Sequence, residues 1–423
     1  MKRSVISVMF VFIIFGLVSS SWSLEKIGKM YLPTKSGYKY HGPDGGFNPK
    51  FENQPIIASY GWNAKNPDEI KDMVPDFFYN MLKHPEVWGK IRVNVTPFIQ
   101  YDCEAFRRYQ QATEKYKGTC KVGPEGELLN YIAGCPFPDP KTGLELIYNF
   151  EQRFRADDRH MPGFAYMVDR KGLIRWNYWD NNILYYSSRM LLDPKPLFIP
   201  NPSNIQATQV MAMMEPYSIQ GAFGKFHRYW DSQRDDDFWM YFPFFRRVRR
   251  MSTKQRQDTI GSGSFVTWDS QEIFMGKVPQ FTWKILGRKE MLTVRNGKLD
   301  FGWDKGKFYF GNDNYYQRVN TYVLEGRSKD PNYMYSKMVF YVDPTNWLIT
   351  WEICYDAKGR PWHVENYCWG AGGNWIPEPV MNHIDIQRQY TSHCMITKSQ
   401  YNNNYKPAFF NLDNLKKVYP VGR

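Results

Sequence analysis

The residues best suited to bind a charged ligand in this 423-residue sequence are four arginines within five positions. They are Arg246, Arg247, Arg249 and Arg250. Guanidinium groups at this density repel one another unless water or an anion lies nearby. An aromatic run, residues 237–242, directly precedes them. Arginines at the rim of an aromatic-lined concavity would bind the head group of an amphiphile through charge-assisted hydrogen bonds. The alternative, that they pair with nearby acids or face solvent, stays open.

Strand alternation limits which of these arginines can reach a ligand. Successive side chains of a strand point to opposite faces, so Trp239 and Tyr241 share one face of the aromatic run. If the strand continues past Pro243, only one arginine pair faces inward, either Arg246 with Arg250 or Arg247 with Arg249. The aromatic residues predicted to contact the ligand are Trp239, Tyr241, Trp268, Phe281 and Trp283.

Signatures of catalysis are missing from the sequence. It contains no G-x-S-x-G elbow, Walker A loop, H-E-x-x-H zinc motif or haem attachment motif. Paired carboxylates for glycoside hydrolysis are not located, because the candidate acids are scattered over strands and turns. These acids are Asp343, Glu352, Asp356 and Glu365. The seven histidines show no zinc spacing. We therefore expect no catalytic residue, no metal and no cofactor.

The elements that must position these residues are mostly strands. Aromatic residues make up 17% of the chain, and large rings favour pleated, half-buried strands. After Met161, aromatic and β-branched runs alternate with turn signals at intervals of about 8 to 15 residues, with no helical pattern between them. This spacing is typical of an antiparallel meander rather than of βαβ units. We predict one strongly curved antiparallel sheet, mainly within residues 161–400.

Helical signals precede the sheet, between residues 66 and 156. Asp102 is predicted to cap a helix that continues to Lys117. Thr142 and Glu145 have the spacing of a capping box at the start of another helix. We expect these helices to pack on the sheet.

The first residues predict export. Lys2 and Arg3 form a positive region, an apolar run covers residues 5–18, and small residues precede Leu24. As a helix the run would rise about 21 Å, too short for a hydrocarbon core of about 30 Å. We predict a cleaved signal peptide and a soluble, periplasmic product, with an uncleaved anchor as the alternative. A net charge of +13 would suit nucleic acid, but export argues against that partner.

These signals divide the chain into four parts. Residues 1–23 are the signal peptide, 24–65 an extended Gly- and Pro-rich arm, 66–400 a single domain, and 401–423 a C-terminal tail.

Six cysteines in an exported chain permit disulfides, but 15 pairings are possible. The cysteines are Cys103, Cys120, Cys135, Cys354, Cys368 and Cys394. If residues 356–359 are a two-residue hairpin turn, Cys354 faces Pro361. Cys368 then lies about 23 Å along the partner strand, which disfavours pairing between Cys354 and Cys368. The remaining connectivity stays open.

Several motifs together resemble one bacterial exported family, the domain of unknown function 1329. They are Trp239-x-Tyr-x-Pro with the following arginines, Ala133-Gly-Cys-Pro-Phe-Pro-Asp-Pro140, Gly261-Ser-Gly-Ser-Phe265 with Trp268, Trp283-x-x-x-Gly-Arg-Lys-Glu290, and Tyr341-Val-Asp-Pro344. The resemblance covers roughly residues 65 to 400. It implies a fold like that of the LolA/LolB lipoprotein-sorting superfamily, in which a half-barrel sheet wraps around helices and its apolar interior holds acyl chains. The N-terminal arm and the extra cysteines depart from the family pattern.

From these observations the leading hypothesis is a periplasmic carrier or chaperone for a lipid or acylated lipoprotein. Its partners would include inner- or outer-membrane transport components. An envelope enzyme that acts on glycans or lipids is the first alternative, since sheets rich in Trp and Tyr also stack on sugars. The second is a structural subunit of an envelope transport complex.

Overall fold

The computed structural model describes residues 66–89, 91–95, 103–260, 263–294, 313–371, 377–396 and 399–420. All of them belong to one compact unit. The predicted signal peptide, residues 1–23, and the arm, residues 24–65, lie outside the described residues. No helix within the described ranges has both the length and the apolar character needed to cross a membrane.

Helices are short and occur mainly near the two ends of the described chain. The α-helices are α4 (Asp76–Lys83), α5 (Pro85–Trp88), α6 (Glu104–Lys115), α7 (Gly143–Glu151) and α8 (Leu412–Val418). The 3-10 helices are η1 (Pro67–Met73), η2 (Tyr217–Ile219), η3 (Pro243–Phe245), η4 (Thr253–Gln257), η5 (Val278–Gln280) and η7 (Pro407–Phe410).

Strands form most of the described structure. The first nine are β1 (Arg92–Val95), β2 (Lys121–Val122), β3 (Leu128–Leu129), β4 (Asp158–Asp169), β5 (Gly172–Tyr185), β6 (Ile205–Glu215), β7 (Phe223–Tyr229), β8 (Asp237–Phe242) and β9 (Arg247–Arg250). The others are β10 (Phe281–Val294), β11 (Asp313–Ser328), β12 (Lys337–Val342), β13 (Ile349–Tyr355), β14 (Pro361–Ala371), β15 (Pro377–Asp385), β16 (Tyr390–Ile396) and β17 (Gln400–Tyr401).

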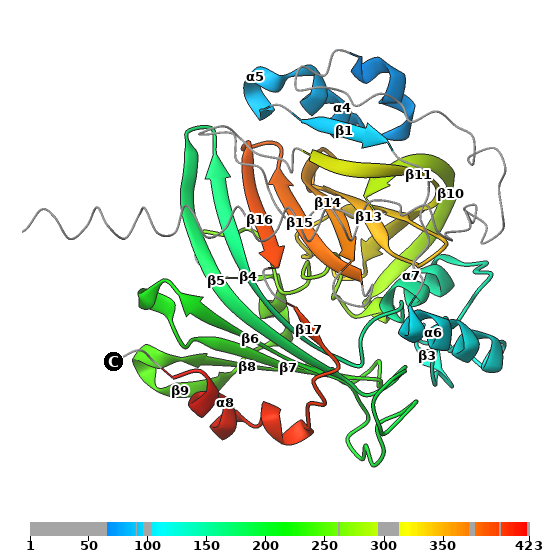
Figure 1. Ribbon diagram of the computed structural model, residues 1–423, viewed down its shortest axis with the longest axis vertical. Coiled ribbons are helices and arrows are strands. Elements are labelled where there is room, and N and C mark those ends of the chain that lie inside the picture. Colours follow the sequence, from blue (N-terminus) through cyan, green and yellow to red (C-terminus); the bar gives the residue numbers. More distant parts are fainter. Residues whose placement is uncertain are drawn as a thin grey trace, which may run out of the picture. The chain divides into compact units, whose positions relative to one another are not determined.

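Fifteen strands of the described chain form one open sheet. Its order is β1-β11-β12-β13-β14-β15-β16-β4-β5-β6-β7-β8-β9, with β10 paired to β11 and β17 paired to β4. Neighbouring strands are antiparallel except β1 and β11, which pair in parallel. The long strands β4 and β5 curve strongly through the molecule (Figure 1). The predicted fold class, a curved and mainly antiparallel sheet with few helices, is confirmed.

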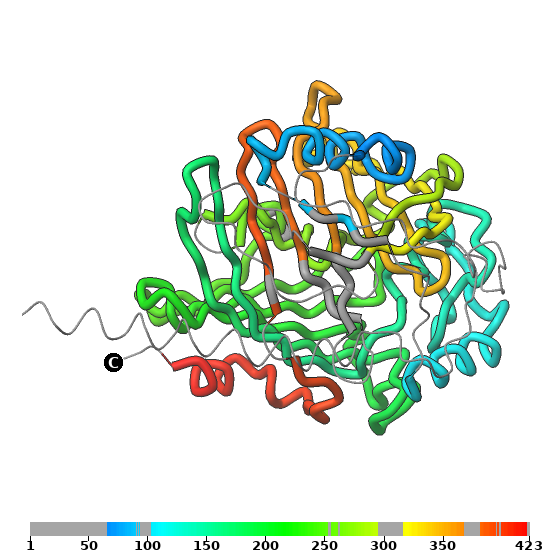
Figure 2. The backbone as a smooth tube through the Cα atoms, turned by 45° about the horizontal axis from the view of Figure 1, so that its top comes forward, coloured from blue at the N-terminus to red at the C-terminus, as the bar shows by residue number. Residues whose placement is uncertain are grey.

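Both faces of the sheet are apolar and both are covered. In β12, Met338 and Phe340 belong to one buried cluster, whereas Val339 and Tyr341 belong to another. The first cluster, on what we call the inner face, includes α6 and α7; the second, on the outer face, includes η1 and α4. Figures 1 and 2 show η1 and α4 in blue above the yellow and orange strands. The predicted helices therefore pack on the sheet from both sides, because alternating side chains of one strand expose two apolar faces.

The predicted C-terminal tail extends the sheet and covers part of it. Strand β17 pairs with β4, and Phe410, Leu415 and Tyr419 are buried with residues of β5, β6 and β7 in a third cluster. Figure 2 shows the red C-terminal helix beneath the green strands.

One long connection occupies the inner face of the sheet. It joins β9 to β10 and comprises residues 251–280, of which 261 and 262 are not described; we call it the inner segment. Its side chains Val266, Trp268, Ile273 and Phe274 are buried against the strands. Because these side chains pack on the inner face, the inner segment limits the open space that remains there.

Local signals in the sequence are confirmed in part. The capping box is present: Glu145 donates its backbone N–H to the Thr142 hydroxyl at 3.2 Å, and the Glu145 carboxylate accepts from the Thr142 N–H. The helix predicted to start at Asp102 is instead capped by Cys103, whose sulfur accepts from the Phe106 N–H.

Candidate functional site

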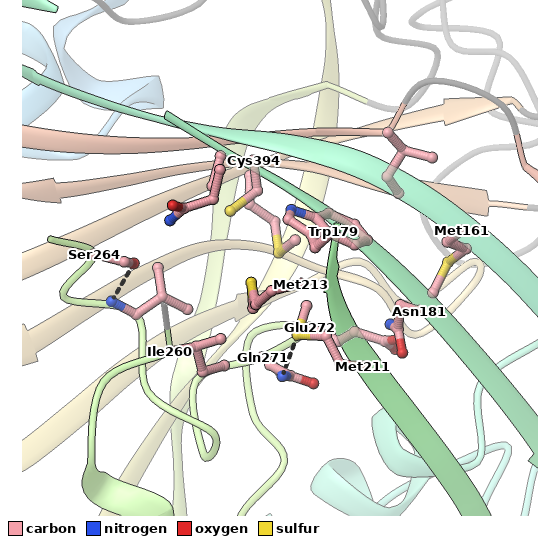
Figure 3. A pocket seen from close by; sticks show the side chains of 15 residues that line it. Met161, Trp179, Asn181, Met211, Met213, Ile260, Ser264, Gln271, Glu272 and Cys394 are labelled. Carbon is pink, nitrogen blue, oxygen red and sulfur yellow. Dashed lines mark hydrogen bonds between the residues drawn. The ribbon is translucent and has the colours of Figure 1, made fainter. Parts of the chain in front are cut away.

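An apolar cavity lies between the sheet and the inner segment (Figure 3). Strands β4, β5, β6, β15 and β16 form one wall, and the inner segment forms the other. The lining residues are Met161, Ala165, Asn177, Trp179, Asn181, Met211, Met213, Ile260, Ser264, Val266, Gln271, Glu272, Met381, Cys394 and Ile396. The open volume is about 50 Å³, which is room for a few water-sized groups or a short alkyl segment.

Methionines give this cavity an adaptable wall. Met161, Met211, Met213 and Met381 all line it, and each is buried. A methionine side chain has three rotatable bonds and a polarisable sulfur, so it changes shape at low cost and suits variable apolar ligands. Rotation of these side chains is therefore a means by which the cavity wall adjusts to an apolar ligand.

The carboxylate of Glu272 marks the polar edge of the cavity. Its Oε2 lies 2.7 Å from a guanidinium nitrogen of Arg153, and its Oε1 pairs with Arg159. All three side chains are buried. Burial by itself would raise the pKa of Glu272, but the charges of Arg159 and Arg153 lower it, so the carboxylate stays ionised. This group ties the inner segment to β4 and to the end of α7.

A second small cavity adjoins the first along the inner segment. Gln271 and Glu272 line both cavities, so they stand between them. Trp268 and Phe226 line the second cavity, and their ring centroids lie 4.9 Å apart. The open volume there is again about 50 Å³.

A larger polar cleft adjoins the second cavity. Its open volume is about 550 Å³, and Asp236 and Arg256 line both spaces. Arg256 pairs with Asp236 at 3.3 Å and with Asp269 at 2.7 Å. The cleft also contains Lys277 and Lys329. The three spaces thus follow one another from the polar cleft through the second cavity to the apolar cavity. Polar and charged side chains line the cleft, which is the largest of the three, and mainly apolar side chains line the apolar cavity.

The sheet register brings two of the scattered acids together on the inner face. Glu352 of β13 lies directly opposite Glu365 of β14, which lies opposite His383 of β15. A Glu365 oxygen is 2.6 Å from Nδ1 of His383, and the Tyr367 hydroxyl donates to its other oxygen at 2.5 Å. The prediction that these carboxylates lie apart was therefore wrong for Glu352 and Glu365. The pairing register of β13 and β14 places them opposite each other.

Burial shifts the pKa values in this row. Burial and the neighbouring Glu365 carboxylate hold the pKa of Glu352 well above its usual value. Burial alone would lower the pKa of His383, but Glu365 and the neighbouring Cys394 thiol raise it to about 10. None of the three spaces described above is lined by Glu352, Glu365 or His383. Within the described ranges, no group of three or more His, Cys, Asp or Glu side chains is arranged to hold a metal ion.

The predicted arginine cluster lies away from these cavities. Strand β8 ends at Phe242, and η3 and a left-handed Arg246 turn the chain back into β9, the last strand of the sheet. The condition that the strand continues past Pro243 is not met, because the proline starts a turn. Arg247 and Arg249 face the same side as Met240, yet all four arginines are exposed. Their role in ligand binding stays a prediction.

The aromatic residues predicted to contact the ligand do not lie in one site. Trp268 lines the second cavity, and Phe281 lines the polar cleft. Trp283 packs against Phe274 and donates its Nε1–H to the Val278 carbonyl at 3.0 Å. Trp239 and Tyr241 lie on the outer face of β8, where Tyr241 stacks on Phe223 and Trp239 lies beside Lys225.

The residues that form the apolar cavity were not predicted from the sequence. Met211 and Met213 alternate with Val210 and Ala212 in β6, a period of two that would have indicated a strand with two buried faces. No local signal identifies Glu272, which follows a turn and meets its arginine partners more than 100 residues away in sequence.

The cysteines are thiols where the structure describes them. Cys120, Cys135, Cys354 and Cys394 form no disulfide, and Cys394 lines the apolar cavity. The side chain of Cys368 lies outside the described residues. The predicted facing of Cys354 and Pro361 was wrong: the turn places Tyr355 opposite Pro361, and a register shift between Cys354 and Tyr355 places Cys354 opposite His363.

Three solved structures are similar to parts of this fold. A putative outer membrane lipoprotein-sorting protein domain from Vibrio parahaemolyticus is 14% identical, with a TM-score of 0.48, over 65% of this chain and 98% of that one. A DUF1329 family protein from Desulfovibrio piger is 15% identical, with a TM-score of 0.47, over 64% and 97%. The LolA superfamily protein NE2245 from Nitrosomonas europaea is 13% identical, with a TM-score of 0.39, over 65% and 99%.

Sequence comparison identifies the family. The uncharacterized protein PA3922 of Pseudomonas aeruginosa is 24% identical over 330 residues, which is 75% of this chain and 70% of that protein. The family model described as "Protein of unknown function (DUF1329)" matches residues 63–416. That match covers most of the sequence and agrees with the motifs from which the resemblance was inferred. The chain therefore belongs to the DUF1329 family.

Proposed function

We propose that this protein is a non-enzymatic carrier or chaperone that binds the apolar chain of a lipid or acylated lipoprotein in the cell envelope. The observation that supports this function best is the methionine-lined cavity between the sheet and the inner segment. A buried apolar cavity is poorly hydrated, so a hydrocarbon chain binds there without displacing well-bound water. The predicted signal peptide supports a periplasmic location, and membrane transport components are the partners that such a carrier would serve.

The order of the three spaces suggests how an amphiphile lies in the protein. The head group occupies the polar cleft, whose lining carries charges of both signs. The cations are Arg256, Lys277 and Lys329, and the acids are Glu125, Asp235, Asp236, Asp269 and Asp330. The chain passes Trp268 in the second cavity and ends among the methionines of the first. Passage requires Gln271 and Glu272, which line both inner cavities, to move aside. In this proposal the head group lies in the cleft rather than beside the arginine cluster.

Enzymatic function receives less support from the same geometry. The facing pair Glu352 and Glu365 is the best candidate for acid–base chemistry among the described residues, but neither residue lines any of the three spaces described above. Its hydrogen bonds with Cys354 and Tyr367 are suited to a structural role.

The test is a titration with a fluorescent fatty acid, together with native mass spectrometry of protein purified from its own host. Ala165→Leu fills the apolar cavity from β4, whereas the matched control Ala212→Leu adds the same volume on the opposite face of β6. At about 0.8 kcal/mol per buried methylene, excluding two methylenes of the ligand weakens binding by roughly tenfold. We expect that loss for Ala165→Leu and parent-like affinity for Ala212→Leu.

Two results would contradict the proposal. One is a parent protein that neither binds the fatty acid nor retains a lipid on purification. The other is equal affinity in both variants, provided that circular dichroism shows both to be folded. A co-purified glycan in place of a lipid would favour the envelope enzyme.

A further inference from the structure

The turn between β8 and β9 exposes aromatic side chains to a degree that folding does not explain. Phe244 is 90% exposed and Phe245 is 56% exposed, although each carries a large apolar ring. They form η3 with Pro243, and their ring centroids lie 5.2 Å apart. Leaving two phenylalanines in water forfeits the free energy that their burial would provide, so the exposed pair suggests a surface that becomes covered.

Positive charge surrounds this aromatic pair. Arg246 follows it directly, and Arg247 and Arg249 lie on the strand that leaves the turn. None of these three has an acidic partner among the described residues, whereas Arg250 pairs with Asp237. The Arg249 guanidinium lies 5.7 Å from the Phe245 ring centroid. The surface therefore combines exposed rings with at least three uncompensated positive charges.

A neighbouring turn adds to the same surface. Phe223 at the start of β7 faces Tyr241 near the end of β8, so the β6–β7 turn and the β8–β9 turn lie at the same end of these strands. Figure 1 shows both green turns at that end. Tyr217 in the β6–β7 turn is 70% exposed. We call Tyr217, Phe244, Phe245 and the three arginines the tip surface.

Protection of the sheet edge explains only half of this surface. Strand β9 ends the sheet, and charged side chains on an edge strand prevent unwanted pairing with other strands. That role accounts for Arg247 and Arg249. It does not account for Phe244 and Phe245, since exposed aromatic residues promote association at an edge.

We infer that the tip surface docks on an anionic phospholipid bilayer. Phenylalanine rings at a turn enter the boundary between head groups and acyl chains, while neighbouring arginines bind lipid phosphates. Charge complementarity favours this occupant over an apolar protein groove, which would have to bury the three guanidinium groups. The inference goes beyond ligand binding in the cavity and does not depend on it.

The experiment is co-sedimentation of the full mature protein with vesicles. One set contains phosphatidylcholine alone, and the other contains phosphatidylcholine mixed with phosphatidylglycerol. We expect binding to the anionic vesicles that weakens with added salt. The triple variant Arg246→Gln, Arg247→Gln, Arg249→Gln should lose about a hundredfold in vesicle affinity. The double variant Phe244→Ser, Phe245→Ser should lose roughly tenfold or more.

A matched control separates this surface from the overall positive charge. Lys115, Lys117 and Lys121 are exposed at the distant α6 region, and their change to Gln removes the same charge. We expect parent-like vesicle binding for that control, and parent-like fatty acid binding for every variant. Absence of binding to anionic vesicles, or equal losses in the control and tip variants, would overturn the inference. Loss of fatty acid binding by the parent would instead reject the cavity proposal alone.

Discussion

Glu272 joins the inner segment to the rest of the molecule through buried ion pairs. Its carboxylate neutralises Arg153 and Arg159, which are 8% and 2% exposed as side chains. Glu272→Gln removes the charge but keeps the shape, so two buried guanidinium groups lose their counterion. We expect the free energy of unfolding to fall by about 3–5 kcal/mol, measured by urea denaturation.

An exposed ion pair provides the comparison for Glu272. Glu104 and Arg108 form an i,i+4 pair on α6 at 2.5 Å, and Glu104 is 67% exposed. Glu104→Gln should cost no more than about 0.5 kcal/mol. Similar losses in the two variants would show that Glu272 does not hold a buried charge network.

The carboxyl row of β13 and β14 predicts that stability depends on pH. Glu352 has a pKa raised well above 4.5 in the folded protein by burial and by Glu365. A raised pKa means that the folded state binds a proton that the unfolded state releases above about pH 4.5. Each such proton lowers the free energy of unfolding by about 1.4 kcal/mol per pH unit as the pH rises.

His383 also makes stability fall as the pH rises, over a higher pH range than Glu352. Its pKa is raised from 6.5 to about 10, so its contribution is complete below pH 6.5 and is lost as the pH rises toward 10. We expect urea denaturation to show falling stability from mildly acid to alkaline pH. Glu352→Gln should reduce the dependence of stability on pH in the range below pH 6.5. Glu114→Gln, at an exposed position, should leave that dependence unchanged. Parallel curves of stability against pH for parent and Glu352→Gln would contradict the raised pKa of Glu352.

At the scale of elements, α7 shows how local sequence supports the site. The helix buries Leu146, Ile147 and Phe150 against the inner face, and its capping box fixes where it begins. Thr142→Ala removes the hydroxyl that accepts from the Glu145 N–H. We expect a loss of about 1 kcal/mol in the free energy of unfolding. Thr142→Ser keeps the hydroxyl and should restore stability; equal losses in both would exclude the cap as the cause.

At the scale of the whole molecule, the cavity is a product of two distant parts of the chain. The sheet supplies Cys394 from β16, and the inner segment closes over it. N-ethylmaleimide should therefore label the half-buried Cys120 first and Cys394 slowly, when the cavity opens. A bound fatty acid should block access of the reagent to Cys394. At a fatty acid concentration about ten times its Kd or higher, we expect labelling of Cys394 to slow by about tenfold or more.

Cys120 serves as the internal control in that measurement. It lies beyond the end of α6 and does not line the apolar cavity. Mass spectrometry of labelled peptides follows both thiols in one sample. If the fatty acid slows Cys120 and leaves Cys394 unchanged, the ligand lies elsewhere.

Local patterns in the sequence determined the type of fold. The alternation of residues 237–242 predicted β8 with its observed bounds, and the capping box predicted the start of α7. The motifs identified the family that the sequence model confirms. These features follow from interactions within a few residues, such as side-chain alternation, turn chemistry and capping, so they can be read from one segment at a time.

Tertiary structure alone decided where the candidate site lies. Glu272 meets Arg159 across 113 positions of sequence, and Glu352 faces Glu365 only because β13 and β14 pair in that register. The arginine cluster, although obvious in the sequence, lies on an edge strand away from the cavities because the chain turns at Pro243. Which side chains surround a cavity depends on the register and packing of distant strands, and no local pattern in the sequence specifies either.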